Sequence, residues 1–236
     1  QRQMCIRDRD KIRVILKCIS IILLFTICFL LLGKGADKLH WYSIEKRWKG
    51  FKVVYYQNSI YGNIAVIIQD NSQYTFYFNG IPVITTPIPD ISTQEEFVHI
   101  PMLLHKKPEE ILILGGGAGG VINEILKHKT VNKVTYAELD PNIFKVLKKF
   151  STPLTKFELN NTKVNIKNID GRLFIKITPF KYDIVFVGFS DPKDLQINRF
   201  FTKEFFLLVK KKLKSEGIVV ITLPAVSYTH LTLPTN

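Results

Sequence analysis

The strongest constraint on the fold is the glycine-rich segment Gly115–Gly120 (GGGAGG), which lies between an apolar run and a helical pattern. Ile111–Leu114, directly before it, is a continuous apolar segment, typical of a strand buried on both faces of a sheet. Gly120–His128, directly after it, carries apolar residues at helical spacing. The sequence therefore predicts a strand, a tight glycine turn and a helix, in that order.

The same alternation continues along the rest of the chain. Further apolar strands are predicted at Lys133–Glu138, Lys163–Lys167, Tyr182–Val187 and Gly217–Leu223, with helices at Pro141–Phe150 and Thr202–Leu213. Strands that alternate with helices indicate a parallel, doubly wound α/β sheet. We expect this Rossmann-like sheet to be truncated after its fifth strand.

The glycine segment contains the pattern G-x-G-x-x-G at Gly115, Gly117 and Gly120. Such glycines permit a tight turn and let a ligand approach the backbone at a helix N-terminus. Glu138 ends the next strand, 23 positions after Gly115, where an acid can accept both hydroxyls of a ribose. These features predict a nucleoside site and leave NAD and S-adenosylmethionine-type ligands both open.

Two more polar segments follow predicted strands. Asp170-Gly171 follows the third strand, and its carboxylate can accept a hydrogen bond from an adenine amino group. Ser190-Asp191-Pro192 follows the fourth strand. Ligands of open α/β sheets bind outside the carboxyl ends of the strands, so we expect these acids to lie near the glycine segment.

Short strands are predicted ahead of this region, within Phe51–Ile84, where runs rich in aromatic and β-branched residues are separated by turn residues. Asn79-Gly80 is a typical tight-turn pair. Glu95–His105 has the pattern of a short helix.

Cys18–Gly33 contains no charged residue and, with the apolar residues before Lys17, is about as long as a membrane-crossing helix. A secretory signal or a buried core helix is the alternative, although GKGADK is a poor cleavage site. When the first nine residues are left out, lysines and arginines are more numerous after this segment than before it. This favours a membrane anchor with the following domain in the cytoplasm.

The two ends have the character of non-native tails. Gln3–Arg9 can be encoded by a nucleotide string whose reverse complement encodes Val226–Leu231, a relationship typical of adaptor read-through. We therefore expect Gln1–Arg9 and Val226–Asn236 to be foreign, which leaves +11 of the formal net charge of +13. We also expect the natural protein to continue beyond both ends.

The remaining positive charge fits membrane flanks and solvated helix ends, because no base-stacking motif accompanies it and nucleic acid is not expected as a partner. No group of His, Cys and carboxylate residues has metal-ligand spacing, so the sequence predicts no metal. Cys18 and Cys28, both in the apolar run, do not indicate an oxidising compartment.

Over about Val53–Pro224 the chain resembles the polyamine aminopropyltransferases (spermidine and spermine synthases), above all the bacterial membrane-fused branch. The segments that carry the resemblance are SIYGNIAVI, YFNGIPV, EEFVHIPMLLH, ILILGGGAGGVINEILKH, VTYAELDP, IDGRLF and YDIVFVGFSDPKDLQINRFFTKEFFLLVKKKLKSEGIVV. The resemblance implies a small β domain before a methyltransferase-like Rossmann domain. It also implies decarboxylated S-adenosylmethionine as co-substrate and an amine or diamine as acceptor.

By the same resemblance, Glu138 binds the ribose and Asp170 the adenine edge, with Gly171 in the cofactor-binding motif. The chain departs from the family pattern at two positions, one that contacts the amine of the donor and one that accepts a proton from the acceptor amine. Ala118 stands where the family has an Asp that contacts the donor's amine. Gly188 stands where the family has its proton acceptor.

Asp191, the second acid of the fourth-strand motif, remains, and His99 stands where the family has a tyrosine. Asp191 and His99 are therefore the candidate catalytic residues, because histidine as a residue type has an ordinary pKa, about 6.5, that suits a base. A histidine that only packs or forms hydrogen bonds is an equally good interpretation of His99.

Three functions fit these observations: an aminopropyltransferase, an S-adenosylmethionine-dependent methyltransferase, and a non-catalytic nucleoside-binding module of a membrane protein.

The expected organisation is a tail (1–9), a transmembrane helix (10–35), a linker with a small β domain (36–94), a Rossmann-like domain (95–225) and a second tail (226–236). A homo-oligomer is possible on this interpretation.

Overall fold

The structure, a computed structural model of the 236-residue chain, describes residues 2–32, 35–69, 72–189 and 195–222. Contacts between Cα atoms divide the chain into two units, Gln1–Lys52 and Val53–Asn236. The predicted C-terminal tail and the predicted catalytic Asp191 lie outside the described residues.

The first unit consists of two helices, α1 (Arg2–Leu32) and α2 (Gly35–Arg47). Within α1, Ile12–Phe29 is long and apolar enough to cross a membrane, and none of it is buried. The hydroxyls of Ser20 and Thr26 each donate to the carbonyl four residues earlier, at 2.9 and 2.8 Å, so both polar groups are satisfied inside the helix. Signal sequences also have this length and composition, so the membrane anchor stays a prediction here.

The second unit begins with a four-stranded sheet in the order β1-β2-β3-β4. Its strands are β1 (Lys52–Asn58), β2 (Asn63–Gln69), β3 (Gln73–Phe78) and β4 (Ile81–Thr86). Strand β3 pairs antiparallel with both β2 and β4. Asn79 and Gly80 join β3 to β4 with φ angles of 51° and 80°, which confirms the tight turn predicted from this pair.

A five-stranded parallel sheet follows, in the order β7-β6-β5-β8-β9. Its strands are β5 (Glu110–Leu114), β6 (Lys133–Glu138), β7 (Val164–Asn168), β8 (Tyr182–Val187) and β9 (Leu213–Ile221). The helices around it are α3 (Ile91–Leu104), α4 (Val121–Leu126), α5 (Pro141–Lys149), α6 (Pro153–Asn160), α7 (Gly171–Ile177), α8 (Leu195–Asn198) and α9 (Lys203–Lys212). This is the predicted Rossmann-like fold, preceded by the small sheet.

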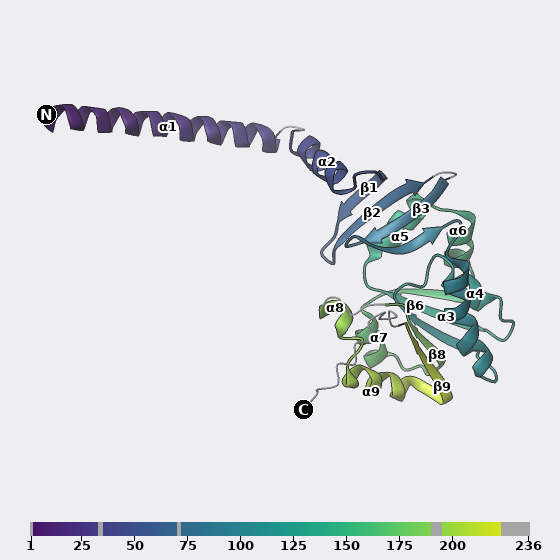
Figure 1. The fold of residues 1–236 in the computed structure, drawn as a ribbon. Helices are drawn as coiled ribbons and strands as arrows, with labels where there is room; N and C mark the ends of the chain where they lie inside the picture. The colour runs from purple at the N-terminus through teal and green to yellow at the C-terminus, as the bar shows by residue number, and fades with distance from the viewer. Residues whose placement is uncertain (1, 33–34, 70–71, 190–194, 223–236) are drawn as a thin grey trace, which may run out of the picture. The chain divides into compact units, whose positions relative to one another are not determined.

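Alternate residues of the central strand face opposite sides of the large sheet. Ile111 and Ile113 belong to a core with α3, α4 and α5, whereas Leu112 and Leu114 belong to a core with α7 and α9. Figure 1 shows these two helical layers around the sheet. Strands covered on both faces explain why the sequence is continuously apolar there.

The small sheet shares the first of these cores, since Val66 and Phe76 pack in it. A hydrogen bond of 2.6 Å from the hydroxyl of Ser59 to the carboxylate of Asp140 also ties it to the loop after β6. The small sheet is therefore part of the same compact unit as the large one.

Strand β9 differs from its prediction in its first half. Leu213 pairs with Tyr182, but the next pair is Ile218 with Ile184, so the residues between bulge out of the ladder. Glu216, within the bulge, has a φ of 62°, typical of a tight turn. Regular pairing thus begins near Gly217, where the sequence predicts the strand.

Candidate functional site

The carboxyl ends of the parallel strands meet at one edge of the large sheet. Leu114 of β5 pairs with Ala137 of β6 and with Val187 of β8, and Glu138 pairs with Asn168 of β7. The glycine loop, Glu138, Asp170 and Gly188 therefore follow neighbouring strand ends, as the sequence predicts for a ligand site of an open α/β sheet.

The glycine loop, Gly115–Gly120, is packed tightly against the residues after β8. The N–H of Gly188 donates to the carbonyl of Leu114 at 3.1 Å. A Cβ atom on Gly116, whose φ is +62°, would lie 2.7 Å from the carbonyl oxygen of Gly188. A Cβ atom on Gly188 would lie 2.3 Å from the carbonyl oxygen of Gly115. Position 188 therefore cannot carry a side chain unless the loop moves.

Phe189 covers the start of the glycine loop with its ring. A Cβ atom on Gly115 would lie 2.4 Å from the end of this ring. The ring also lies 4.7 Å, centroid to centroid, from that of Phe200. The sheet edge thus has an aromatic wall beside the loop, and only the position of Phe189 after a predicted strand indicated this from the sequence.

Glu158, which the sequence analysis did not single out, binds the other end of the loop. Its carboxylate accepts from the N–H groups of Gly119 and Gly120, both at 2.7 Å, and of Asn123 at 3.1 Å. The side chain is completely buried. Burial raises the pKa of Glu158, and the three backbone donors only partly oppose that rise. Glu158 is placed by α6, a helix that the sequence analysis did not predict.

Glu158 narrows the range of ligands that fit the loop. In dinucleotide-binding folds, a pyrophosphate accepts hydrogen bonds from N–H groups at this helix N-terminus. Here the N–H groups of Gly119 and Gly120 already serve an internal carboxylate, and an incoming phosphate would meet its negative charge. The geometry favours a nucleoside without a phosphate at this helix over NAD.

Glu138 lies at the end of β6 with its carboxylate held from several sides. It accepts from the Tyr136 hydroxyl and from the Leu139 N–H, each at 2.9 Å. Burial raises the pKa of Glu138, although hydrogen bonds from Tyr136 and from backbone N–H groups, including that of Gly116, lower it in part. The bond from Gly116 places Glu138 beside the glycine loop, where a ribose acceptor is predicted.

Tyr136 supports this arrangement from below the loop. A Cβ atom on Gly117 would lie 3.0 Å from the Tyr136 ring, so Gly117 allows the ring to approach. Burial raises the pKa of Tyr136 well above 10, and the charge of Glu138 raises it further. Tyr136 therefore stays protonated and donates to Glu138.

Asp170 already has two partners in the structure. One carboxylate oxygen accepts from the Leu173 N–H at 2.9 Å and caps α7, and the other forms an ion pair with Arg199. Gly171 is buried, and a Cβ atom there would lie 3.2 Å from Leu114. An adenine amino group at Asp170 would therefore share the carboxylate with Arg199.

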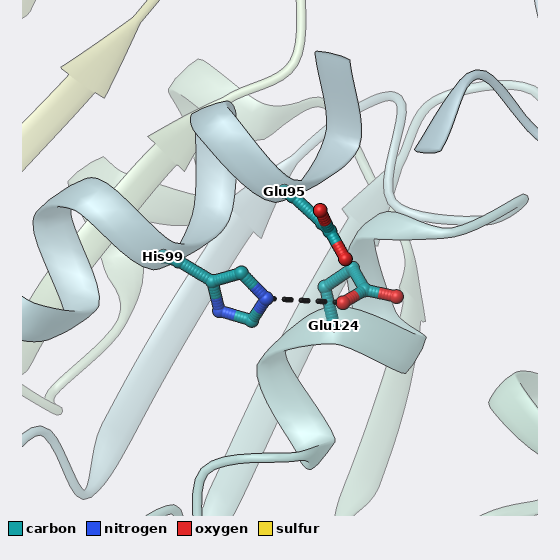
Figure 2. A group of neighbouring side chains, drawn as sticks. All are labelled: Glu95, His99 and Glu124. Carbon is teal, nitrogen blue, oxygen red and sulfur yellow. Dashed lines mark hydrogen bonds and ion pairs between the residues drawn. The ribbon is translucent and has the colours of Figure 1, made fainter. Parts of the chain in front are cut away.

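His99, on α3, lies against residues of α4 and the turn after it. Its Nε2 atom is 3.1 Å from a carboxylate oxygen of Glu124, and its Nδ1 atom is 2.8 Å from Nε2 of His128. Glu95 completes the group in Figure 2, where Glu95 and His99 project from one helix toward Glu124 on the other. The other predicted catalytic residue, Asp191, lies outside the described residues.

Glu124 is the buried acid of this group. Burial raises its pKa, but hydrogen bonds from Lys127, Asn123 and His99 together with the charge of Lys127 outweigh burial and lower it. The pKa of His128 is lowered by burial and by the neighbouring His99, although the charge of Glu124 opposes this. The group therefore combines an ionised carboxylate with imidazole nitrogens.

Comparison with known proteins identifies polyamine aminopropyltransferases among the relatives of this chain. The model of the spermine/spermidine synthase domain matches residues 90–233. The polyamine aminopropyltransferase of Bacillus subtilis is 30% identical over 187 residues, which cover 76% of this chain and 66% of that protein. Polyamine aminopropyltransferase 1 of Bacillus cereus is 38% identical over 138 residues, 58% of this chain and 50% of that protein.

Solved structures give the same result. A spermidine synthase in complex with the transition-state analogue AdoDATO superposes with a TM-score of 0.65 at 26% identity, covering 72% of this chain and 57% of that one. The spermidine synthase of Thermotoga maritima gives a TM-score of 0.63, also at 26% identity, over 72% of this chain and 56% of that one. The chain thus spans about half to two thirds of the length of the relatives it matches.

Proposed function

The chain belongs to the spermine/spermidine synthase family, and we propose that it transfers an aminopropyl group from decarboxylated S-adenosylmethionine to a small amine or diamine. The observation that carries this proposal is the glycine loop with its N–H groups at α4 held by Glu158 and with Glu138 beside it. This arrangement suits a nucleoside without a phosphate, and decarboxylated S-adenosylmethionine is such a nucleoside.

The donor's nucleoside binds along the carboxyl edge of the sheet in this proposal. Gly115, Gly117 and Gly120 allow the tight turn of the loop against which Phe189 and Tyr136 pack, and Glu138 accepts the ribose hydroxyls. Asp170 accepts from the adenine amino group while it stays paired with Arg199, and Gly171 lets the start of α7 pack closely against Leu114. The Phe189 ring offers an apolar surface to the flat base.

The reaction forms one bond and breaks another at a single carbon. The nitrogen lone pair of a neutral amine attacks the methylene next to the sulfonium, and the carbon–sulfur bond breaks with its electron pair on sulfur. Methylthioadenosine leaves as a neutral thioether, and the new ammonium gives a proton to a nearby base. The amine must be neutral before attack, so the base and its charge decide the pH dependence.

The part of the site that would receive the proton of the acceptor amine differs from the family pattern at Gly188. Since any side chain there would collide with Gly115, the proton must go elsewhere. We assign this role to Asp191, because both ring nitrogens of His99 are already engaged, by Glu124 and by His128. Acidic groups at the site also suit a cationic diamine.

A non-catalytic nucleoside-binding module is the second candidate, and the exclusion of a side chain at Gly188 is the observation that favours it. A methyltransferase is the third, because Ala118 offers no charge to a donor's amine and the donor could keep its carboxylate.

Turnover of the full chain in detergent separates the three candidates. The chain is incubated with either decarboxylated or ordinary S-adenosylmethionine and a panel of diamines, and methylthioadenosine is measured. We expect it to form only with the decarboxylated donor. Donor binding without product would support the non-catalytic module, and a methylated amine from the ordinary donor would support the methyltransferase.

We also propose that Ile12–Phe29 anchors the protein in a membrane with the second unit on the cytoplasmic side. The length of the segment, its exposed apolar side chains and its internally bonded Ser20 and Thr26 support this. The basic residues that follow it support the cytoplasmic side.

A further inference from the structure

Two packed segments of the chain each contain a glutamate and a histidine four residues apart. Glu95 and His99 lie on α3, and Glu124 and His128 lie on α4 and directly after it. Residues four apart share one face of a helix, so Glu95 and His99 present a carboxylate and an imidazole together on α3. Both helices belong to the same core, which brings the two pairs into contact.

The ligand atoms of Glu95, His99 and Glu124 all lie within 4.8 Å of one another. His99 Nε2 and the nearer Glu124 oxygen are 3.1 Å apart. Two ligands of one tetrahedral metal ion, each at about 2.0–2.2 Å, are separated by about 3.4 Å. Small side-chain rotations would therefore bring the three atoms onto one ion (Figure 2).

His128 provides the support that metal-binding histidines usually have. With a cation at Nε2 of His99, its Nδ1 carries the proton and donates to His128 Nε2, which lies 2.8 Å away. An outer hydrogen bond of this kind fixes the tautomer and the orientation of a ligating imidazole. His128 would therefore orient the ligating imidazole of His99 without itself binding the ion.

A cation already neutralises part of this site. Nζ of Lys127 lies 2.5 Å from the Glu124 oxygen that faces His99, and the Lys127 side chain is 52% exposed. Asn123 donates to the other Glu124 oxygen at 3.0 Å. A long, exposed lysine can swing away, so a metal ion would exchange with its ammonium group.

We propose that Glu95, His99 and Glu124 bind a divalent first-row transition-metal ion such as Zn²⁺, with His128 supporting the ligand His99. Two carboxylates and one imidazole suit Zn²⁺ and its neighbours, and three protein ligands leave further positions for water. Glu95 is exposed and His99 partly so, which gives the ion access from solvent. This site is separate from the proposed transfer activity.

The test measures metal binding rather than turnover, so that its failure leaves the proposed function untouched. The full chain, without a histidine tag and freed of metal by a chelator, is titrated with Zn²⁺ by calorimetry and with Co²⁺ by visible absorption. We expect one saturable site per chain and a rise in the unfolding temperature on metal addition.

Variants identify the ligands. Glu95→Gln, Glu124→Gln and His99→Asn should each weaken binding by about tenfold or more, and His128→Gln by about tenfold. Glu96→Gln removes the same charge one position along the same helix and should leave binding unchanged. Lys127→Met should tighten binding, because it removes the competing ammonium group.

Two results would overturn the proposal: no saturable binding of either ion below about 1 mM, or equal binding by Glu95→Gln and Glu96→Gln. Circular dichroism of the metal-free variants shows whether each is folded. Glu95 is exposed, so its variant tests the site even if the buried Glu124 is needed for folding.

Discussion

Gly188 lies so close to Gly115 that a Cβ atom added to Gly188 would be 2.3 Å from the Gly115 carbonyl oxygen. This contact joins the loop after β8 to the glycine loop after β5. It also means that an acid cannot simply be restored at position 188, although the family resemblance places one there.

Gly188→Ala should lower the free energy of unfolding by about 1–3 kcal/mol, because its methyl group overlaps a backbone oxygen that cannot rotate away. Chemical unfolding of the full chain in detergent measures this. Gly171→Ala is the matched control, since its Cβ would lie 3.2 Å from the nearest atom and a smaller loss is expected. An equal or smaller loss for Gly188→Ala than for Gly171→Ala would contradict the contact.

Glu158→Gln should destabilise the glycine loop. The buried carboxylate accepts three backbone hydrogen bonds, whereas a glutamine offers one oxygen and turns an NH₂ group toward the remaining donors. A loss of about 1–3 kcal/mol in unfolding free energy is expected, together with faster amide exchange at Gly119 and Gly120. The exposed Glu96→Gln serves as control, and unchanged exchange in Glu158→Gln would refute the role given to Glu158.

Glu138→Gln should weaken binding of methylthioadenosine, which contains the ribose but no amine, by about tenfold or more. The sharper comparison uses the 2′-deoxy analogue in calorimetry. The unmodified protein should lose affinity for the analogue, whereas Glu138→Gln should lose little more, because the partner of the missing hydroxyl is already gone. Additive losses would show that Glu138 does not bind the ribose.

Asp183, in β8, holds the start of β5 through hydrogen bonds whose contribution to stability should depend on pH. Burial raises its pKa, but a hydrogen bond from Lys214 and those from the N–H groups of Glu110 and Glu109 outweigh burial and lower it. Because the pKa of Asp183 is lower in the folded protein, its carboxylate stabilises the fold at pH values above its pKa in the unfolded chain. This stabilisation is lost as the pH falls through the pKa in the folded protein.

Asp183→Asn should therefore cost about 1–3 kcal/mol of unfolding free energy at pH 7, and the difference should shrink as the pH falls below about 4. Unfolding curves at several pH values measure it. Lys214→Met should show a smaller loss with the same sign of pH dependence. A constant difference between Asp183→Asn and the unmodified protein at all pH values would be inconsistent with the lowered pKa.

Ile21→Arg places a charge near the middle of Ile12–Phe29 and should cost about 2.5–3.5 kcal/mol of membrane insertion. Ile12→Arg, at the end of the segment, should be tolerated, because its side chain can reach the interface. Carbonate extraction of membranes from expressing cells measures the retained fraction. Equal retention of the two variants, or loss of the unmodified chain from the membrane, would argue against a spanning helix.

Local patterns made much of the fold predictable. The apolar run at Ile111–Leu114, the helical spacing after it and the Asn79-Gly80 pair each act over a few residues, so their structures follow from backbone preferences and hydrophobic periodicity. The placement of Glu138 and Asp170 at one sheet edge follows from the same reasoning, because parallel strands bring their carboxyl ends together.

Sequence patterns did not predict which side chains fill the site. Glu158 reaches the glycine loop from a helix 38 residues away, and Arg199 pairs with Asp170 across 29 residues. Neither contact follows from a motif, because only the packing of α6 and of the segment after β8 decides it.

The sequence by itself determined the alternation of strands and helices, the nucleotide-type turn and the family resemblance, since these depend on residues that are near neighbours in the chain. Only the tertiary structure decided that the Glu95–His99 pair meets the Glu124–His128 pair, about 25 residues on. No ligand spacing within either segment predicts that meeting, because the packing of two helices, rather than the chain between them, brings the donor atoms together.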